Sequence, residues 1–225
     1  MSWSEAREAD IMPAREAIGH YFIEFSQLVL RMRYVMAFRL TREHDEHELG
    51  ELAFAGAAAQ QIADSFFSMC RYDGNFDDDE LAVSGALYDE VRAVITERNE
   101  FAHGDWWVGR LSFEDFKSVA PPELVVRKPK RKKGDFADFN QWTVERLKER
   151  SQRLEELVQD VTVFGYVALG LPIATRTDEH GMLIHESRGH RVGDFLTVAP
   201  ARPKEGTKAR AVMKTDAPQL LLQIS

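Results

Sequence analysis

The residues best suited to chemistry lie in one short segment, Arg98–Gly104, in which four residues separate an arginine from a histidine. A histidine takes up and releases a proton near neutral pH, so His103 is a candidate general acid or base. An arginine keeps its charge and can hold a phosphate group or stabilise an oxyanion, which makes Arg98 a candidate phosphate-binding residue. Asn99 is a candidate positioning residue beside it. Arg98, Asn99 and His103 are therefore the candidate catalytic residues.

A helix over about Asp79–His103 is expected to position this segment. Acidic residues at its start favour the positive end of the helix dipole, and Gly104 is a typical helix end. At 100° per residue, Arg98 falls within the apolar stripe that includes Val91, while His103 lies about 140° from Arg98. The two side chains therefore converge only if the last turn is distorted or if a second chain completes the site.

A guanidinium within an apolar stripe needs acceptors, because burying its charge alone is costly. Arg98 can bind an anionic ligand, or it can pin its helix to a neighbour through Glu97, Glu100 or an acidic residue of the preceding helix. His103 can likewise be a capping residue bonded to a carbonyl group. In this second interpretation the pair is structural, and a carboxylate should bind Arg98.

Three further helices are expected from apolar residues spaced three and four apart. In chain order, the four expected helices span about Pro13–Glu43, Glu46–Tyr72, Asp79–His103 and Phe139–Leu169. This pattern predicts an all-α fold, a four-helix, up-and-down bundle over residues 1–170.

Two regions lie outside the expected bundle. The insert 105–138 has short apolar segments at 106–108 and 124–126 around the pair Pro121-Pro122, which favours a small hairpin. Residues 171–225 have no helical period, so we expect an irregular C-terminal tail, with 182–185 and 195–198 as candidates for a short strand pair.

The arginine, its polar neighbour and the histidine, late in a helix of an all-helical domain, resemble the HEPN superfamily. The resemblance covers roughly Ile18–Leu169 and makes the expected bundle HEPN-like. HEPN members are commonly dimeric, and many are metal-independent ribonucleases of toxin–antitoxin and antiphage systems. The resemblance implies that His103 and Arg98 act on the scissile phosphate of RNA, with the ribose 2′-hydroxyl as nucleophile. It also implies a homodimer and a cognate antitoxin or regulatory protein as partner.

Two function classes follow from these residues. One is a metal-independent endoribonuclease that uses His103 as general acid or base and Arg98 to stabilise the transition state. The other is a noncatalytic HEPN-like dimerisation or RNA-binding module in which the same residues are structural. The geometry of Arg98 and His103 distinguishes them.

A cluster of basic residues lies in the insert, downstream of the candidate site. Its members are Arg127, Lys128, Lys130, Arg131, Lys132 and Lys133. The whole chain has a formal net charge of −8 and a pI of about 5.4, so the cluster stands out against an acidic background. Basic residues contact phosphates, which makes the cluster a candidate nucleic-acid-binding loop. The alternative is a solvated loop.

Other classes of function have little support in the sequence. Cys70 is the only cysteine, so neither an intramolecular disulfide nor a four-cysteine zinc site can form. The segment around His44 is rich in metal-ligating residues, but it lies at an expected helix junction without a second cluster, so a polar linker is the better interpretation. The histidines that follow one another every five residues from His180 fit neither helix nor strand spacing, and no nucleotide-binding glycine loop or hydrolase motif is present. We therefore expect no metal and no cofactor. Neither a secretory signal nor an apolar stretch long enough to span a membrane is evident, which predicts a cytoplasmic protein without membrane contact.

Overall fold

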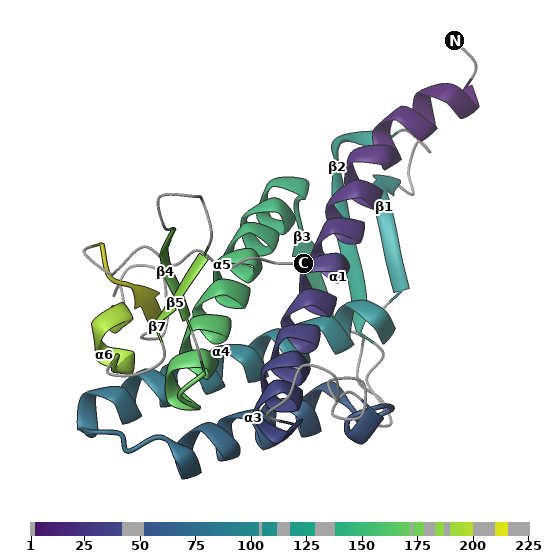
Figure 1. Cartoon of the computed structure of the whole chain (residues 1–225). Helices are drawn as coiled ribbons and strands as arrows, with labels where there is room; N and C mark the ends of the chain where they lie inside the picture. Colours follow the sequence, from purple (N-terminus) through teal and green to yellow (C-terminus); the bar gives the residue numbers. More distant parts are fainter. Residues whose placement is uncertain are drawn as a thin grey trace. The chain divides into compact units, whose positions relative to one another are not determined.

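The structure is a computed structural model in which described residues form five helices and seven strands (Figure 1). It describes residues 3–41, 52–103, 105–111, 118–128, 138–171, 173–177, 183–186, 190–199 and 210–215. The helices are α1 (Trp3–Thr41), α3 (Ala59–Asp73), α4 (Asp78–His103), α5 (Val144–Ala168) and the short α6 (Val192–Phe195). The chain is mostly helical, as expected. Strands are more numerous than the sequence predicts.

Two groups of residues each pack among themselves. The first unit comprises Met1–Ser26 and Val94–Glu155, and the second comprises Gln27–Ala93 and Glu156–Ser225. Helices α1, α4 and α5 each contribute to both units.

The first unit contains a three-stranded antiparallel sheet in the order β1-β2-β3. Its strands are β1 (Asp105–Leu111), β2 (Ser118–Lys128) and β3 (Asp138–Trp142). The predicted pairing of 106–108 with 124–126 is confirmed, since Trp106 lies opposite Val126. The prolines are not at the turn as expected. Pro121 and Pro122 lie within β2 where the register shifts, because a proline has no N–H to give to the ladder.

The predicted start of the last long helix at Phe139 is wrong. Phe139 belongs to β3 and pairs with Arg127 of β2. Helix α5 begins at Val144, after Thr143, whose hydroxyl oxygen accepts a hydrogen bond of 3.1 Å from the backbone N–H of Arg146. This is the bond of an N-cap residue, which satisfies one of the free donors at a helix start.

Aromatic contacts join α1, α4 and β3 in the core of the first unit. The ring centres of Tyr21 and Phe101 are 4.9 Å apart, and those of Phe101 and Trp142 are 4.7 Å apart, both in edge-to-face arrangements. All three residues are buried. Edge-to-face pairs favour one ring orientation, so these contacts fix the last turn of α4 and the candidate residues on it.

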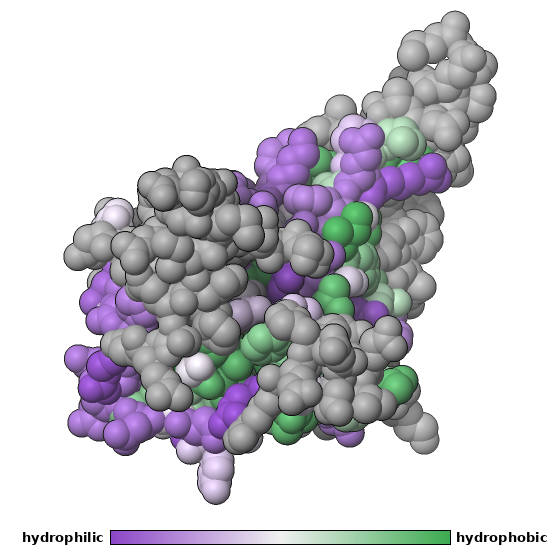
Figure 2. Space-filling model, in the orientation of Figure 1, coloured by the Kyte–Doolittle hydropathy of each residue, from purple (hydrophilic) through white to green (hydrophobic). Residues whose placement is uncertain are grey.

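The predicted helix over Asp79–His103 is confirmed as α4. A reciprocal pair of hydrogen bonds closes its start. Oδ1 of Asp77 accepts from the backbone N–H of Glu80 at 3.0 Å, and Oε2 of Glu80 accepts from the backbone N–H of Asp77 at 3.1 Å. This capping box satisfies donors that the helix itself leaves free. The exposed acidic residues at this end make the surface there hydrophilic (Figure 2).

Two other predicted helix boundaries are wrong. Proline is common in a first helical turn, but α1 begins at Trp3 and contains Pro13 in its interior. The predicted helix Glu46–Tyr72 does not run without a break, because the chain turns at 54–56 and α3 begins only at Ala59. Gly56 has a φ of 77° there, a left-handed conformation that an α-helix cannot contain. Residues 42–51 lie outside the described residues.

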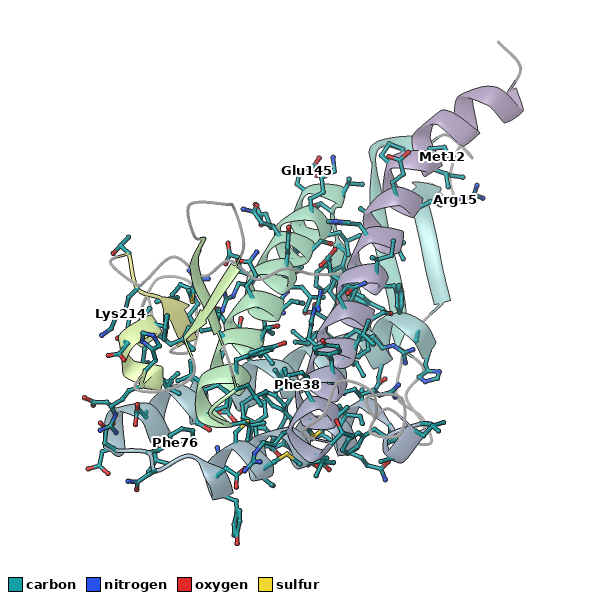
Figure 3. The ribbon with its side chains drawn as sticks, in the orientation of Figure 1. Met12, Arg15, Phe38, Phe76, Glu145 and Lys214 are labelled. Carbon is teal, nitrogen blue, oxygen red and sulfur yellow. The ribbon has the colours of Figure 1, made fainter. Side chains whose placement is uncertain are left out.

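The prediction of an irregular tail is also wrong for the described residues. Strands β4 (Ile173–Thr177) and β5 (Leu183–Glu186) form one antiparallel pair, and β6 (Leu196–Ala199) and β7 (Arg210–Met213) form another. The two segments expected to pair with each other thus form strands with different partners. Phe195 is buried, and its carbonyl oxygen accepts a hydrogen bond of 2.7 Å from the backbone N–H of Lys214, next to α6 (Figure 3).

A buried carboxylate attaches this tail to the start of α4. The Glu80 side chain is 4% exposed and accepts bonds of 2.6 Å from Nη2 of Arg191 and 3.3 Å from the backbone N–H of Gly193. Hydrogen bonds from Arg191 lower the pKa of Glu80, against a smaller effect of burial. Ionised Glu80 therefore stabilises the fold above its ordinary pKa of 4.5, and this contribution is lost as the pH falls through the lowered value.

An Arg191→Met variant should lower the free energy of unfolding at neutral pH, because it leaves the buried Glu80 carboxylate without its partner. Because about half of the Arg191 side chain is exposed, the loss of unfolding free energy should be smaller than for a fully buried ion pair. Urea denaturation measures the change. As a second measurement, Glu80→Gln should lose stability less steeply than the wild type below pH 4.5. Equal slopes would show that Glu80 does not carry the acid dependence.

Substitution of two helix-interior glycines by alanine should change the free energy of unfolding in opposite directions. A Cβ at Gly165 would lie 2.8 Å from the Phe66 ring and 2.9 Å from Val35, whereas a Cβ at Gly85 would meet nothing within 4 Å. Phe66 is fully buried and contacts Phe164, so its ring has no room to move. Gly165→Ala should destabilise the fold by about 1–3 kcal/mol. Gly85→Ala should stabilise it by up to about 1 kcal/mol through helix propensity. Parallel urea denaturation tests both signs.

Candidate functional site

The last two turns of α4 hold the three candidate catalytic residues. Arg98 is partly buried, while Asn99 and His103 are exposed. As the rotation of 100° per residue predicts, Arg98 continues the buried stripe of Val91 and Val94. The three residues therefore lie between the core of the first unit and its surface.

Aromatic rings of α1 hold the Arg98 guanidinium. Its central carbon lies 5.5 Å from the centre of the Phe25 ring and 5.8 Å from that of the Phe22 ring. A ring face attracts a cation at this range by about 0.5–2 kcal/mol. Nη1 of Arg98 donates a hydrogen bond of 3.2 Å to Oδ1 of Asn99. Nε is buried without a hydrogen-bond partner among the described residues. The guanidinium is thus held in place while its Nε–H donor has no acceptor among the described residues.

The carboxylate next to Arg98 in the sequence binds a different arginine. Glu97 accepts from Nη2 of Arg150 at 2.8 Å and from Nε of Arg150 at 3.2 Å. In the part of the chain that the structure describes, no carboxylate is paired with Arg98. The interpretation in which Arg98 pins its helix through Glu97 therefore does not fit. Among the described residues, the positive charge of Arg98 therefore has no neutralising partner.

His103 is the last residue of α4 and is exposed. Because α4 is α-helical as far as His103, the side chains of Arg98 and His103 leave the helix about 140° apart. The distorted last turn that would bring them together within one chain is not present. Of the two routes to a working pair, only the contribution of a second chain remains.

Tyr21 is a neighbour of the site that the sequence did not single out. It is 1% exposed, and its hydroxyl lies beside the Glu97 carboxylate without a hydrogen bond of good geometry among the described residues. Burial raises the pKa of Tyr21, the charge of Glu97 and the closeness of its carboxylate to the hydroxyl raise it further, and Arg150 and Arg98 act in the opposite direction. The hydroxyl therefore lies within electrostatic reach of all three charged residues.

Arg150 was also missed, although the sequence contains a signal for it. It follows the buried Leu147 by three residues and precedes the buried Leu154 by four, so it lies on the inward face of α5. A charged residue at such a position requires a partner of opposite charge. Tyr21 had no comparable signal, because a tyrosine in an apolar stripe is ordinary.

The predicted nucleic-acid-binding cluster is only partly described. Arg127 and Lys128 are the last residues of β2, where they pair through the backbone with Phe139 and Asp138. The positions of their side chains, and residues 129–137, lie outside the described residues. So do His44 and His180. Among the residues that are described, no group of three or more histidine, cysteine or acidic side chains is arranged to hold a metal ion.

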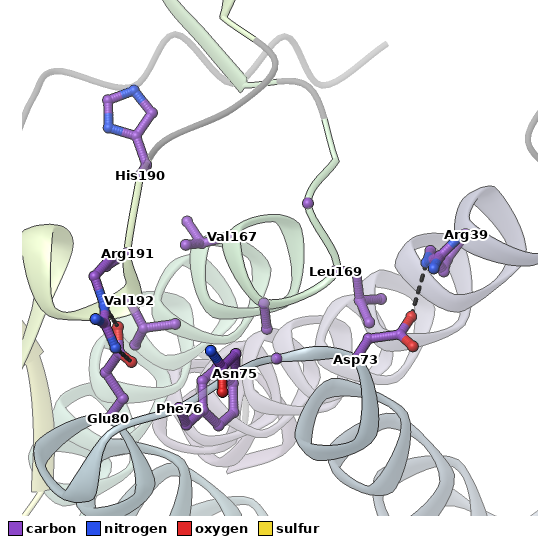
Figure 4. A pocket seen from close by; sticks show the side chains of 13 residues that line it. Arg39, Asp73, Asn75, Phe76, Glu80, Val167, Leu169, His190, Arg191 and Val192 are labelled. Atoms are coloured by element: carbon purple, nitrogen blue, oxygen red, sulfur yellow. Dashed lines mark hydrogen bonds and ion pairs between the residues drawn. The ribbon is translucent and has the colours of Figure 1, made fainter.

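The second unit contains a cavity of about 360 Å³ between helix ends (Figure 4). An ion pair of Arg39 with Asp73, 2.8 Å long, closes one side. Arg191 lines the other side, bound to Glu80 at 2.6 Å and Asp77 at 3.0 Å. Apolar residues, among them Phe76, Val167, Leu169 and Val192, line the space between these pairs. Because both arginines are neutralised by carboxylates, this cavity is less suited to an anion than the surroundings of Arg98.

The fold and the site define a mostly helical protein in which the last two turns of one helix carry an exposed asparagine, an exposed histidine and an arginine that no carboxylate of the described residues neutralises. Comparison with models of known families, with curated proteins and with solved structures finds no match for this chain. No helix within the described residues combines the length and apolarity needed to cross a membrane.

Proposed function

We propose that the protein is a metal-independent endoribonuclease of the HEPN type, built on a four-helix HEPN-like bundle and active as a homodimer. The observation that carries this proposal is that Arg98, held over two aromatic rings in the same helix end as the exposed Asn99 and His103, pairs with no carboxylate of the described residues. A structural arginine at a partly buried position would be expected to bind a carboxylate, and the adjacent Glu97 binds Arg150 instead.

The charge of Arg98 favours a phosphate as its ligand. Two unit charges 4 Å apart attract each other by about 4 kcal/mol at the effective dielectric constant typical of a protein surface. An arginine also offers parallel N–H donors that match two oxygens of a phosphate. An RNA backbone supplies such groups, and the basic cluster 127–133 would add contacts to neighbouring phosphates.

The proposed reaction is a transfer of the phosphoryl group within RNA. The ribose 2′-oxygen forms a bond to phosphorus, and the bond from phosphorus to the 5′-oxygen of the next nucleotide breaks. His103 takes the proton of the 2′-hydroxyl as general base and returns it to the leaving 5′-oxygen as general acid, so that the protons balance. Arg98 stabilises the negative charge that collects on the phosphoryl oxygens. The products are a 2′,3′-cyclic phosphate and a 5′-hydroxyl.

The separation of Arg98 and His103 makes the dimer part of this mechanism. One copy would supply Arg98 to a scissile phosphate, and the second copy would supply His103. A two-fold axis near the ends of the two α4 helices would form two equal sites of this kind. A cognate antitoxin or regulatory protein that covers this surface would control the activity.

The test is cleavage of a mixed RNA pool in EDTA by the wild type and by His103→Ala. Cleavage by the wild type, lost in a variant with an unchanged circular dichroism spectrum, would support the endoribonuclease. Absence of cleavage, or equal cleavage by the variant, would reject it. If RNA still binds without being cleaved, the alternative of a noncatalytic RNA-binding or dimerisation module is favoured. The divergence of Arg98 and His103 within one chain is consistent with that alternative.

A further inference from the structure

We propose that Arg150 is a positioning residue that holds Glu97 away from Arg98 and thereby keeps the charge of Arg98 free for an anionic ligand. The proposal rests on the function proposed above and extends it from α4 to α5. It starts from three charged residues of the first unit, Glu97, Arg98 and Arg150.

Arg150 binds Glu97 through Nε and Nη2, which form one edge of its guanidinium. Nε donates to Oε1 and Oε2 at 3.2 Å each, and Nη2 donates to Oε2 at 2.8 Å. The Glu97 side chain is 15% exposed and that of Arg150 is 36% exposed. A forked pair with little solvent around the carboxylate fixes the position of the carboxylate far better than a pair in open water.

The two arginines compete for one carboxylate. Glu97, Arg98 and Arg150 all act electrostatically on the buried hydroxyl of Tyr21, so they lie around one point. Two positive charges and one negative charge leave this cluster with a net charge of +1. Because Glu97 is bound to Arg150, the surplus positive charge resides on Arg98.

One N–H donor of Arg98 has no acceptor in the described part of the chain, as expected if Glu97 is bound to Arg150 and the surplus positive charge is on Arg98. Its Nε is buried and has no hydrogen-bond partner among the described residues. Without Arg150, the released Glu97 carboxylate could turn to the adjacent Arg98, which is paired with no carboxylate among the described residues. An ion pair between them would neutralise the residue that the ligand needs.

The test uses variants of matched charge. Arg150→Gln removes the residue that holds Glu97, and the double variant Glu97→Gln/Arg150→Gln removes both charges, so that its net charge equals that of the wild type. Binding of a fluorescent, non-cleavable 2′-O-methyl RNA is measured by anisotropy. Arg150→Gln should bind at least tenfold more weakly, and the double variant should return to within about threefold of the wild type.

A direct contact between Arg150 and RNA predicts a different result. In that case the double variant stays as weak as Arg150→Gln, and the proposal is overturned. Arg150→Lys, which keeps a cation beside Glu97, should bind within about threefold of the wild type. If Arg150→Gln fails to fold, the double variant and Arg150→Lys still decide between the two roles.

A crystal structure of Arg150→Gln separates this inference from the proposed function. The Glu97 carboxylate should lie within ion-pair distance of Arg98 in the variant. A carboxylate that remains turned away from Arg98 would overturn the positioning role, whatever the protein binds. If the wild type binds no RNA but Glu97 moves onto Arg98 as expected, the positioning role holds and the ribonuclease proposal fails.

Discussion

His103→Ala should lower kcat/KM for RNA cleavage by a factor of about 10²–10⁴, the range that a positioned general acid or base contributes. The fold should be unaffected. His103 is exposed and ends α4, and a substitution at such a position changes the free energy of unfolding by less than about 0.5 kcal/mol. The loss should therefore appear in turnover, with RNA affinity nearly unchanged.

A second histidine provides a matched control. His20 is also exposed and lies on α1, 3.6 Å from Glu24. His20→Ala removes the same side chain from the same unit, and it should leave the rate of cleavage within about twofold of the wild type. Loss of activity in both variants would point to a general effect on RNA binding. Activity retained in both would remove His103 from the mechanism.

Arg98→Lys tests the other half of the site in the same assay. A lysine keeps the charge but lacks the planar fork that lies over Phe22 and Phe25 and bonds to Asn99. Cleavage should fall by about 10²-fold, as when one donor to the developing charge is removed. Unlike His103→Ala, this variant should also bind RNA more weakly, because the ground-state phosphate contact changes.

The helix that carries the site was predictable, because its signals are local. The acidic start, the apolar stripe and the glycine after His103 all lie within or next to α4. The inward orientation of Arg98 follows from the helical rotation of 100° per residue. The surroundings of Arg98 were not predictable in this way. Phe22 comes from α1 and Arg150 from α5, and no spacing rule relates residues on different helices.

The tail shows the same limit. The strand at 196–199 has an alternating pattern that can be recognised, but its partner at 210–213 follows a long connection. The anchor of the tail, Glu80, lies on α4, 111 residues before Arg191 in the sequence. Pairing between distant segments depends on the assembled fold, so a strand of four residues can be located by sequence while its partner cannot.

The proposed dimeric form of the site leads to the prediction with the clearest outcome. If each site combines Arg98 of one copy with His103 of the other, a heterodimer of an Arg98→Ala chain and a His103→Ala chain contains one intact site. It also contains one site that lacks both residues. The two chains carry different affinity tags, are co-expressed, and are purified as the heterodimer.

This heterodimer should cleave RNA at about half the wild-type rate, because one of two equivalent sites is complete. Each homodimer of a single variant should be inactive by comparison. If both residues of a site came from one chain, neither chain of the heterodimer would hold a complete pair, and its activity would equal that of the inactive homodimers. The two arrangements therefore differ by about the full factor of 10²–10⁴ that one catalytic side chain contributes. The helical geometry of α4, which separates Arg98 from His103 within a chain, is the reason to expect the active heterodimer.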